Sequence, residues 1–410
     1  MATPVLDTGN TAWMLTSTAL VLFMTLPGLA LFYGGLVRTK NVLSVLMQCF
    51  AIASVVTVLW VICGYSLVFT SASSPGVNAV IGGLGKAFLA GIPRGALTGS
   101  IPETVFAMYQ LTFAIITPAL IVGAFAERVG FAAMLTVAAL WSLVVYVPVA
   151  HWMWGGGWLQ QLGALDFAGG IVVHVTAGVA GLVAALYVGK RRGYPTQAML
   201  PHSLTLSVVG AGMLWVGWFG FNAGSALGAN GTAGMTMAAT QVSAATAATV
   251  WMALEWIRNG RPSVLGLITG AVAGLATVTP ASGYVGIGGA MTIGAVAALV
   301  CYFSATTMKR RFGYDDSLDA FGVHGVGGLV GSLLTGVFAS AALGGTESIS
   351  IARQLGVQAL ACAVTAAWSG LVTWGAFRLV DAIHKSRADD EAEVVGLDLS
   401  DHGERGWDLG

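Results

Sequence analysis

Charged residues are scarce in this sequence. Only 9% of the 410 residues are Asp, Glu, Lys or Arg, and 18 basic residues balance 18 acidic ones, whereas a soluble domain carries about 25% charged residues. The zero net charge excludes a basic nucleic-acid-binding protein and an acidic disordered chain. So few charges could not cover the surface of a soluble globule of this length either.

Cysteines and catalytic clusters are also few. Cys49, Cys63, Cys301 and Cys362 all fall in apolar segments without the spacing of a metal site, so we expect small, buried hydrophobic side chains. No Ser-His-Asp, Cys-His or metal-spaced cluster falls within the apolar segments. We therefore predict neither an enzyme nor a bound cofactor.

Long hydrophobic runs, in contrast, fill the chain, of which 56% is hydrophobic. Eleven of these runs are long enough, or nearly so, for the ~20 residues of a membrane-spanning helix. They are residues 11–36, 42–70, 103–126, 131–150, 167–189, 203–226, 236–257, 263–280, 285–308, 320–340 and 353–380. The sequence thus predicts an all-α polytopic membrane protein of eleven spans, whose 57 glycines allow close helix packing.

The basic residues predict how the spans are oriented. Fifteen of the eighteen Lys and Arg follow odd-numbered spans, and the others are Lys86, Arg94 and Arg353. Basic loops stay in the cytoplasm, so the N-terminus is expected outside and the C-terminus inside. We divide the chain into a membrane domain, 1–380, and a cytoplasmic tail, 381–410. The Ser-, Gly- and Pro-rich external loop, 71–100, is expected to be irregular, and the polar start lacks a signal peptide.

Three histidines, His151, His174 and His324, lie at or within these spans, where an ionisable side chain is costly and suggests function. His174 and His324 both lie in the pattern V-H-x3-G-x2-G. Positions four and seven residues on share the face of the first residue of a helix. Each histidine therefore has glycines on its own face, where another backbone or a narrow pore can come close.

His174 and His324 lie in the fifth and tenth predicted spans. Two successive sets of five spans have opposite orientations, as in transporters built from inverted repeats. We expect spans 1–5 and 6–10 to be such repeats, with facing histidines near mid-membrane and the eleventh span peripheral. Two alternatives remain: unrelated buried histidines, each satisfied by a neighbour, or two axial ligands of a haem.

Long motifs along the chain carry a family resemblance. They are Pro27-Gly-Leu-Ala-Leu-Phe-Tyr-Gly-Gly-Leu-Val-Arg38, His151-Trp-Met-Trp-Gly-Gly-Gly157, Trp218-Phe-Gly-Phe-Asn-Ala-Gly-Ser225, Asp319-Ala-Phe-Gly-Val-His-Gly325 and Gly396-Leu-Asp-x3-His-Gly-Glu404. From about residue 11 to 407 the chain resembles the ammonium transporter (Amt) family, of the bacterial AmtB type. The resemblance implies a homotrimer in the inner cell membrane, with one conduction path in each subunit.

The resemblance also implies roles for individual residues. The external site that recruits ammonium would consist of Trp154, Ser225, Tyr109 and Phe113. A gate would be formed by Phe113 and Phe221, and the pore and its proton relay by His174 and His324. Structural support would come from Asp166 and Trp218. Two residues depart from the family pattern. Tyr109 replaces a frequent Phe, which predicts a slightly more polar site, and Trp407 replaces a frequent Tyr. For Trp154 and Phe113, a place in the lipid-facing aromatic belt or the core is the alternative.

Ammonium chemistry suits such residues. Ammonium resembles K⁺ in size and charge, but it donates hydrogen bonds and can lose a proton. Aromatic faces attract a cation by about 0.5–2 kcal/mol, and an apolar passage admits neutral ammonia while excluding ions. Two facing imidazoles could pass the remaining proton. The competing hypotheses are an electroneutral gas channel of the Rhesus type and an ammonium sensor, which would need an output domain.

Acidic residues raise three further questions. Asp166 could bind the cation directly, or it could cap the fifth span, which we favour. Asp315, Asp316 and Asp319 are expected to cap the tenth span or to be solvated. Nine acids lie in residues 381–410, which could be disordered. The resemblance instead implies a regulatory segment that folds against the basic loops 190–192 and 309–311 and binds a trimeric PII-type signal protein.

Overall fold

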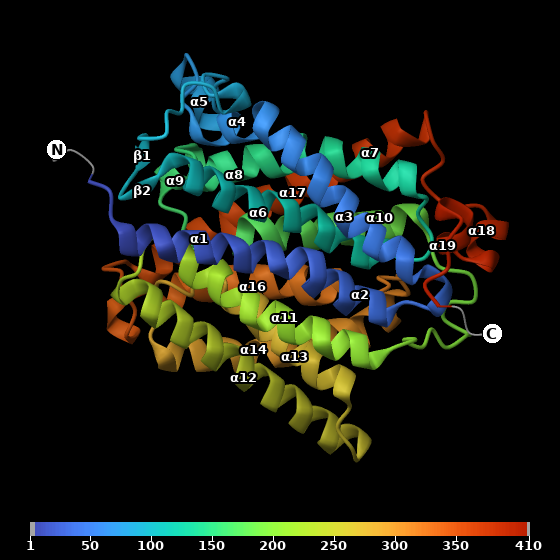
Figure 1. The fold of residues 1–410 in the computed structure, drawn as a ribbon. Helices are drawn as coiled ribbons and strands as arrows, with labels where there is room; N and C mark the ends of the chain where they lie inside the picture. Colours follow the sequence, from blue (N-terminus) through green and yellow to red (C-terminus); the bar gives the residue numbers. More distant parts are fainter. Residues whose placement is uncertain (1–4, 408–410) are drawn as a thin grey trace.

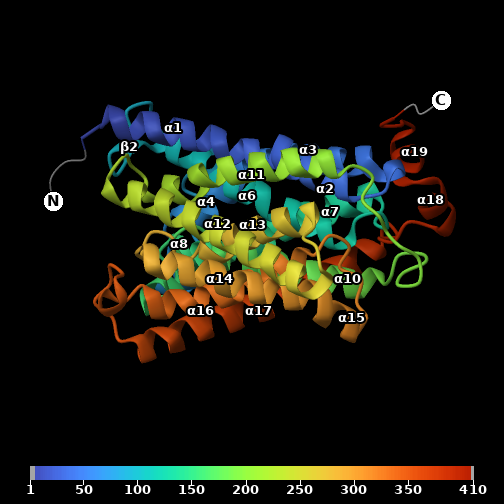
Figure 2. The same cartoon turned by 90° about the horizontal axis from the view of Figure 1, so that it is seen from below.

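The computed structural model describes residues 5–407, most of them in helices that run side by side along one long axis (Figures 1 and 2). Helix α1 (Thr8–Phe23) begins near one end of this bundle, and the short helices α18 (Asp390–Val395) and α19 (Leu397–His402) lie at the other end. The two ends of the described part of the chain therefore lie at opposite ends of the bundle.

Most of the predicted spans are interrupted helices. The α-helices between α1 and α18 are α2 (Ala30–Leu36), α3 (Val42–Leu59), α4 (Tyr65–Phe69), α5 (Pro75–Val80), α6 (Glu103–Phe125), α7 (Phe131–Trp141), α8 (Val147–Trp154), α9 (Trp158–Leu162), α10 (Thr176–Val188), α11 (Leu204–Ala223), α12 (Gly231–Asn259), α13 (Val264–Val278), α14 (Ile287–Phe303), α15 (Lys309–Phe312), α16 (Val326–Phe338) and α17 (Ile351–Asp381). Short 3-10 turns cover Thr39–Asn41, Ala87–Leu89, Gly224–Ala226 and Ala341–Leu343.

Six π-helical segments join the α-helical pieces. They are Met24–Leu29, Trp60–Gly64, Ser142–Tyr146, Gly170–Val175, Ser304–Met308 and Phe321–Gly325. The fourth and ninth predicted spans contain one each, as do the fifth and tenth, so four of the six lie in spans that an inverted repeat makes equivalent. The segments in the first and second spans have no counterpart in the sixth and seventh, both of which the structure describes in full. Segments of this kind are frequent at functional sites. The sequence analysis did not foresee them, because apolar periodicity does not separate α from π turns.

Nine continuous helical stretches in residues 5–407 are long and apolar enough to cross a membrane. The predicted spans 236–257 and 263–280 fall on α12 and α13, which are not among the nine. Helix α13 has only 15 residues, whereas α12 has 29 residues but is rich in Thr, Ser and Gln. The structure thus supports a polytopic membrane protein, and the count of eleven spans remains a prediction.

The loop 71–100 is more ordered than expected. Helix α5 begins at Pro75 and is capped by Ser74, whose hydroxyl accepts from the Val77 N–H at 3.3 Å. Serine before proline is a typical helix start. Strands β1 (Leu97–Thr98) and β2 (Ile101–Pro102) then pair as a small antiparallel hairpin. The prediction of an irregular loop was wrong for these two segments.

The tail is folded against the bundle, so the disordered alternative does not apply to its described part. The Asp398 carboxylate accepts from the backbone N–H groups of Leu43 at 3.0 Å and Ser44 at 2.7 Å, which caps the start of α3. The guanidinium of Arg387 donates to the Val188 and Lys190 carbonyls. Contact with the loop at 190–192 is therefore confirmed.

The tail does not contact the second basic loop as expected. Between residues 381 and 407, no hydrogen bond or ion pair reaches Lys309, Arg310 or Arg311. The side chain of Lys309 instead pairs with Asp319 at 2.5 Å. At the end of the described chain, Trp407 donates its Nε1–H to His202 at 3.3 Å, so this departure from the family pattern has its own docking contact.

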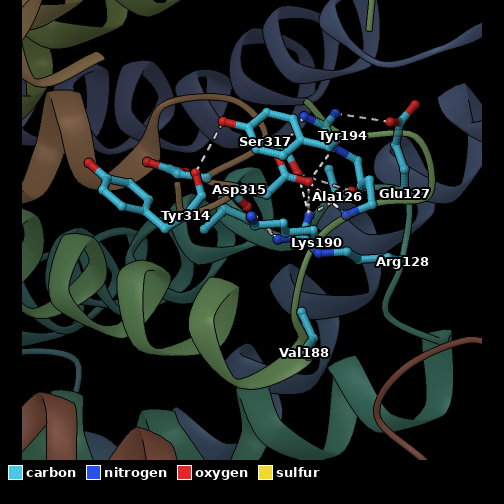
Figure 3. Close-up of polar contacts among 12 residues, drawn as sticks. Ala126, Glu127, Arg128, Val188, Lys190, Tyr194, Tyr314, Asp315 and Ser317 are labelled. Atoms are coloured by element: carbon cyan, nitrogen blue, oxygen red, sulfur yellow. Dashed lines mark hydrogen bonds and ion pairs between the residues drawn. The ribbon is translucent and has the colours of Figure 1, made fainter. Parts of the chain in front are cut away.

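A buried ion cluster joins the loops beneath the tail (Figure 3). The guanidinium of Arg191 pairs with Asp315 at 2.8 Å and with Glu127 at 3.0 Å, and Glu127 also pairs with Arg38 at 2.9 Å. Arg128 is fully buried and donates to the Ser317 hydroxyl and the Asp315 carbonyl. The expectation of a solvated Asp315 was wrong, because the loops that carry Arg128 and Arg191 bury it and pair with it.

Candidate functional site

The tryptophan at the end of α8 lies at one end of a row of aromatic rings. The indole Nε1–H of Trp154 donates to the Asp166 carbonyl at 2.9 Å. Its ring meets the edge of Phe113, with centroids 6.0 Å apart and planes at 83°. Trp154 is partly exposed, whereas Phe113 is buried in α6. The indole is thus held by its N–H while part of its surface stays accessible.

Tyr109 lies one turn before Phe113 on α6, and the two rings are 5.1 Å apart. Its hydroxyl lies 2.9 Å from the Gly220 carbonyl, 3.0 Å from the Phe221 carbonyl and 3.2 Å from the Ser225 hydroxyl. The hydroxyl that was expected to make the site more polar is therefore engaged with the backbone of α11. The ring remains as an aromatic neighbour of Phe113.

The two phenylalanines of the expected gate are in contact. Phe113 and Phe221 have ring centroids 4.4 Å apart, and each is 1% exposed. Phe221 comes from α11, and the hydroxyl of Ser225 donates to its carbonyl at 2.9 Å. Behind this pair, the ring of Phe221 stacks on His174 at 6.0 Å and 23°. The row of rings is continuous from Trp154 to the first histidine.

The two histidines face one another, as the repeat predicted. His174 and His324 stack with centroids 5.2 Å apart and planes at 17°, each on a π-helical segment. A Cβ on Gly178 would lie 2.1 Å from the Gly325 nitrogen, so only glycine allows the two backbones to approach this closely. The shared glycine spacing therefore has a direct steric reason.

The imidazoles border narrow and wide cavities. His174 and His324, with Phe221, Trp218 and eight apolar residues, line a cavity of about 10 Å³, close to the space of one water molecule. His324 also lines a cavity of about 450 Å³ that contains Lys309 and Asp319. Neither ring nitrogen of His174, nor Nδ1 of His324, has a hydrogen-bond partner in the described part of the chain.

Trp218 supports the first histidine from the side. Its indole stacks on His174 at 5.6 Å and 26°, and its Nε1–H donates to the Thr279 hydroxyl at 2.9 Å. The small space beside the two imidazoles argues against haem ligation. A haem needs space between its axial ligands, whereas the cavity that His174 and His324 border together holds only about 10 Å³.

Asp166 caps the segment that carries His174. Its carboxylate accepts from the backbone N–H groups of Gly169, Gly170, Ile171 and Val172 at 2.6–3.0 Å. Burial raises the pKa of Asp166 to about 6, and these four donors oppose that rise. The geometry fits the capping interpretation, since the carboxylate oxygens are occupied by the helix start.

Asp316 is the equivalent carboxylate of the second repeat, which the sequence analysis grouped with Asp315 and Asp319 and did not pair with Asp166. Asp316 is 1% exposed and accepts from the N–H groups of Ala320 at 3.0 Å and Phe321 at 2.8 Å. Capping was expected, but solvation was wrong for this residue, and burial raises its pKa. A spacing could have identified it, because Asp166 and Asp316 each precede their histidine by eight residues.

Comparison with known proteins now decides the family. The family model for the Ammonium Transporter Family matches residues 12–407. This chain belongs to the ammonium transporter family. An ammonium transporter of Aquifex aeolicus is 46% identical over 98% of this chain and 94% of its own length. One of Bacillus subtilis is 45% identical over 97% of this chain and 98% of its own length.

Two solved structures share the fold. Mep2 of Candida albicans has a TM-score of 0.86 and 35% identity, covering 94% of this chain and 87% of that protein. A protein described as "Sensor Amt Protein" has a TM-score of 0.88 and 28% identity, covering 96% of this chain and 98% of its own. The family consists of transporters rather than enzymes.

Proposed function

We propose that this protein recruits ammonium at Trp154, removes its proton, and conducts ammonia through the cavity beside His174 and His324. One observation carries the proposal. A row of aromatic rings ends on two stacked imidazoles, of which His174 has no partner for either nitrogen among residues 5–407. Buried polar atoms are nearly always satisfied, so a polar species in transit is the natural partner.

Recruitment would use the accessible part of the Trp154 indole and the Ser225 hydroxyl. An aromatic face attracts a cation by about 0.5–2 kcal/mol, which is enough to concentrate ammonium without trapping it. Tyr109 contributes its ring, because its hydroxyl is held by backbone carbonyls. The more polar site that this residue suggested is not part of the proposal.

Beyond the Phe113–Phe221 pair, the path would favour a neutral species. The narrow cavity has mostly apolar walls, and burying a bare ion there costs far more than burying a neutral molecule. Ammonium can shed its charge by losing a proton, whereas K⁺ cannot. The gate would open by a small displacement of the Phe113 and Phe221 rings.

The proton would cross by way of the imidazoles. A neutral imidazole has one donor and one acceptor nitrogen, so two neighbouring rings can pass a proton. His174 and His324 are stacked 5.2 Å apart, and His324 reaches the wide cavity. Ammonia and proton would rejoin there, and each ammonium would carry one charge across.

The same proposal includes the setting of the protein. Eleven spans, with α12 and α13 added to the nine long apolar stretches, would place the N-terminus outside and the tail 381–410 in the cytoplasm. The membrane would be the inner cell membrane, and the assembly a homotrimer. A PII-type signal protein would bind at the tail end, where the wide cavity lies and the tail helices dock.

Electrical recording from reconstituted protein tests this proposal. On a supported bilayer, an ammonium pulse is expected to give a transient current, methylammonium a smaller one, and K⁺ at equal concentration none. Protein-free vesicles serve as the control. Ammonia entry without current would instead indicate an electroneutral channel. Binding at Trp154 without flux would favour a sensor.

A further inference from the structure

A buried polar stripe runs along α17, the helix expected to be peripheral. Its members are spaced by three or four residues and so share one face of the helix: Gln354, Gln358, Cys362, Thr365, Ser369 and Thr373. Leu360, Leu371 and Trp374 are exposed on other sides of the same helix. Polar groups in a membrane helix need partners within the protein, so this face is fixed toward the bundle.

Gln358 has the most complete set of bonds in the stripe. Its Nε2–H₂ donates to the carbonyls of Leu165 at 2.8 Å and Ser332 at 3.0 Å. Its Oε1 accepts from the Leu165 N–H at 2.8 Å and from Gln354 at 3.3 Å. The side chain is 0% exposed, and both donors and both acceptor positions of the amide are used.

Leu165 and Ser332, the two backbone partners of Gln358, belong to the two different chain segments that carry the histidines. Leu165 directly precedes Asp166, whose carboxylate caps the segment that carries His174. Ser332 lies in α16, which continues from the segment that carries His324. One amide thus ties the start of one histidine segment to the helix that follows the other. The two rings need a fixed separation to stay stacked at 5.2 Å.

A hydrogen bond from Ser369, another residue of the polar stripe, holds the end of the π-helical segment that follows His174. The Ser369 hydroxyl donates to the Thr176 carbonyl at 2.7 Å, and both residues are fully buried. Thr176 lies two residues after His174 at the start of α10. Helix α17 therefore holds the π-helical segment Gly170–Val175 before and after the histidine.

We infer that Gln358 is a positioning residue for conduction, which sets the placement of His174 against His324 through Leu165 and Ser332. It touches neither the rings nor the cavity, and it acts through the backbone. This inference rests on the proposed role of the two histidines in excluding ions. A displaced His174 ring would open a gap beside Phe221 through which water and K⁺ could pass.

Proteoliposomes with an internal potassium-sensitive dye test the inference. The Gln358→Met variant keeps the side-chain length and removes the amide. We expect K⁺ entry about tenfold above protein-free vesicles, since small misplacements of positioned groups cost one to two orders of magnitude. Wild-type protein is expected to show no entry above that background. A mere loss of folded protein cannot produce this leak.

Gln354→Met is the matched control. It makes the same chemical change one turn earlier and removes the bond to the Gly163 carbonyl at 2.9 Å and the 3.3 Å bond to Gln358. The bonds from Gln358 to Leu165 and Ser332, on which the inference depends, are left in place. K⁺ entry is expected to stay at background. Ser369→Ala, a smaller change at the other tie, is expected to leak in the same direction as Gln358→Met.

The inference is overturned if Gln358→Met and Ser369→Ala both exclude K⁺ as the wild type does, or if Gln354→Met leaks equally. Should Gln358→Met fail to fold, Ser369→Ala decides alone. The K⁺ measurement does not depend on whether ammonium transport carries charge, so the inference can stand if ammonium transport proves electroneutral. In that case, what fails is the proposal that His174 and His324 carry the proton across.

Discussion

The histidines of the bundle differ in how their rings are bonded. Both ring nitrogens of His151 lie 2.6 Å from backbone carbonyls, those of Val68 and Asn78. His174, equally buried, has no partner on either nitrogen in residues 5–407. His151 thus has a backbone oxygen within hydrogen-bond distance of each ring nitrogen. The shared glycine pattern distinguished His174 and His324 from it, but only the coordinates show the difference in bonding.

The His174→Ala variant tests whether the imidazole of His174 helps to exclude K⁺. Removing the ring opens the narrow cavity to water, so discrimination against K⁺ is expected to weaken by about tenfold or more, as for loss of a precisely placed group. Currents evoked by K⁺ and ammonium pulses on a supported bilayer measure it. His384→Ala, which alters an exposed histidine, is the control. Unchanged K⁺ exclusion in the His174 variant would refute the role.

At the scale of helices, several helix starts are capped by carboxylates of other segments, some near in the sequence and some far. Asp166 and Asp316 cap the two π-helical segments from nearby positions in the chain. Asp398 caps α3 from the tail, more than 350 residues away, and Asp401 accepts from the Phe131 N–H at the start of α7 at 2.9 Å. The acidic tail, which composition alone would permit to be disordered, is held by these unpaired backbone donors.

Asp398→Ala tests the docking of the tail. Losing an N-terminal cap costs about 0.5–2 kcal/mol, which corresponds to roughly 2- to 30-fold faster local exchange. Hydrogen–deuterium exchange is expected to accelerate by this amount in α19 and at the start of α3. Asp390→Ala, at an exposed acid of α18, should leave exchange unchanged. Equal protection in both variants would show that the cap does not hold the tail.

For the whole molecule, the buried ion cluster connects segments far apart in the chain. Arg38, Glu127, Arg191 and Asp315 come from four separate loops. Burial raises the pKa of Asp315, but the hydrogen bond and charge of Arg191 outweigh it, so the pKa lies below its usual value. The stabilisation is therefore present above the ordinary aspartate pKa and is lost as the pH falls through the lowered value.

Asp315→Asn tests this cluster. Breaking a buried ion pair leaves Arg191 with an uncompensated charge, and such losses cost about 3–5 kcal/mol. The free energy of unfolding is expected to fall by about that amount near neutral pH, and the deficit to shrink on acidification. Thermal denaturation in detergent across a pH series measures it. Arg192→Ala, at the adjacent exposed arginine, should change stability by less than about 0.5 kcal/mol.

The sequence by itself determined the membrane class, the family and the paired histidines. Hydropathy, charge scarcity and the V-H-x3-G-x2-G spacing are properties of short segments, which can be read without coordinates. Tertiary structure decided that the Tyr109 hydroxyl bonds to α11, that Asp315 is buried, and that Gln358 joins both histidine segments. Those outcomes depend on contacts between residues more than 25 positions apart, and no local pattern specifies which distant carbonyl or guanidinium a side chain will meet.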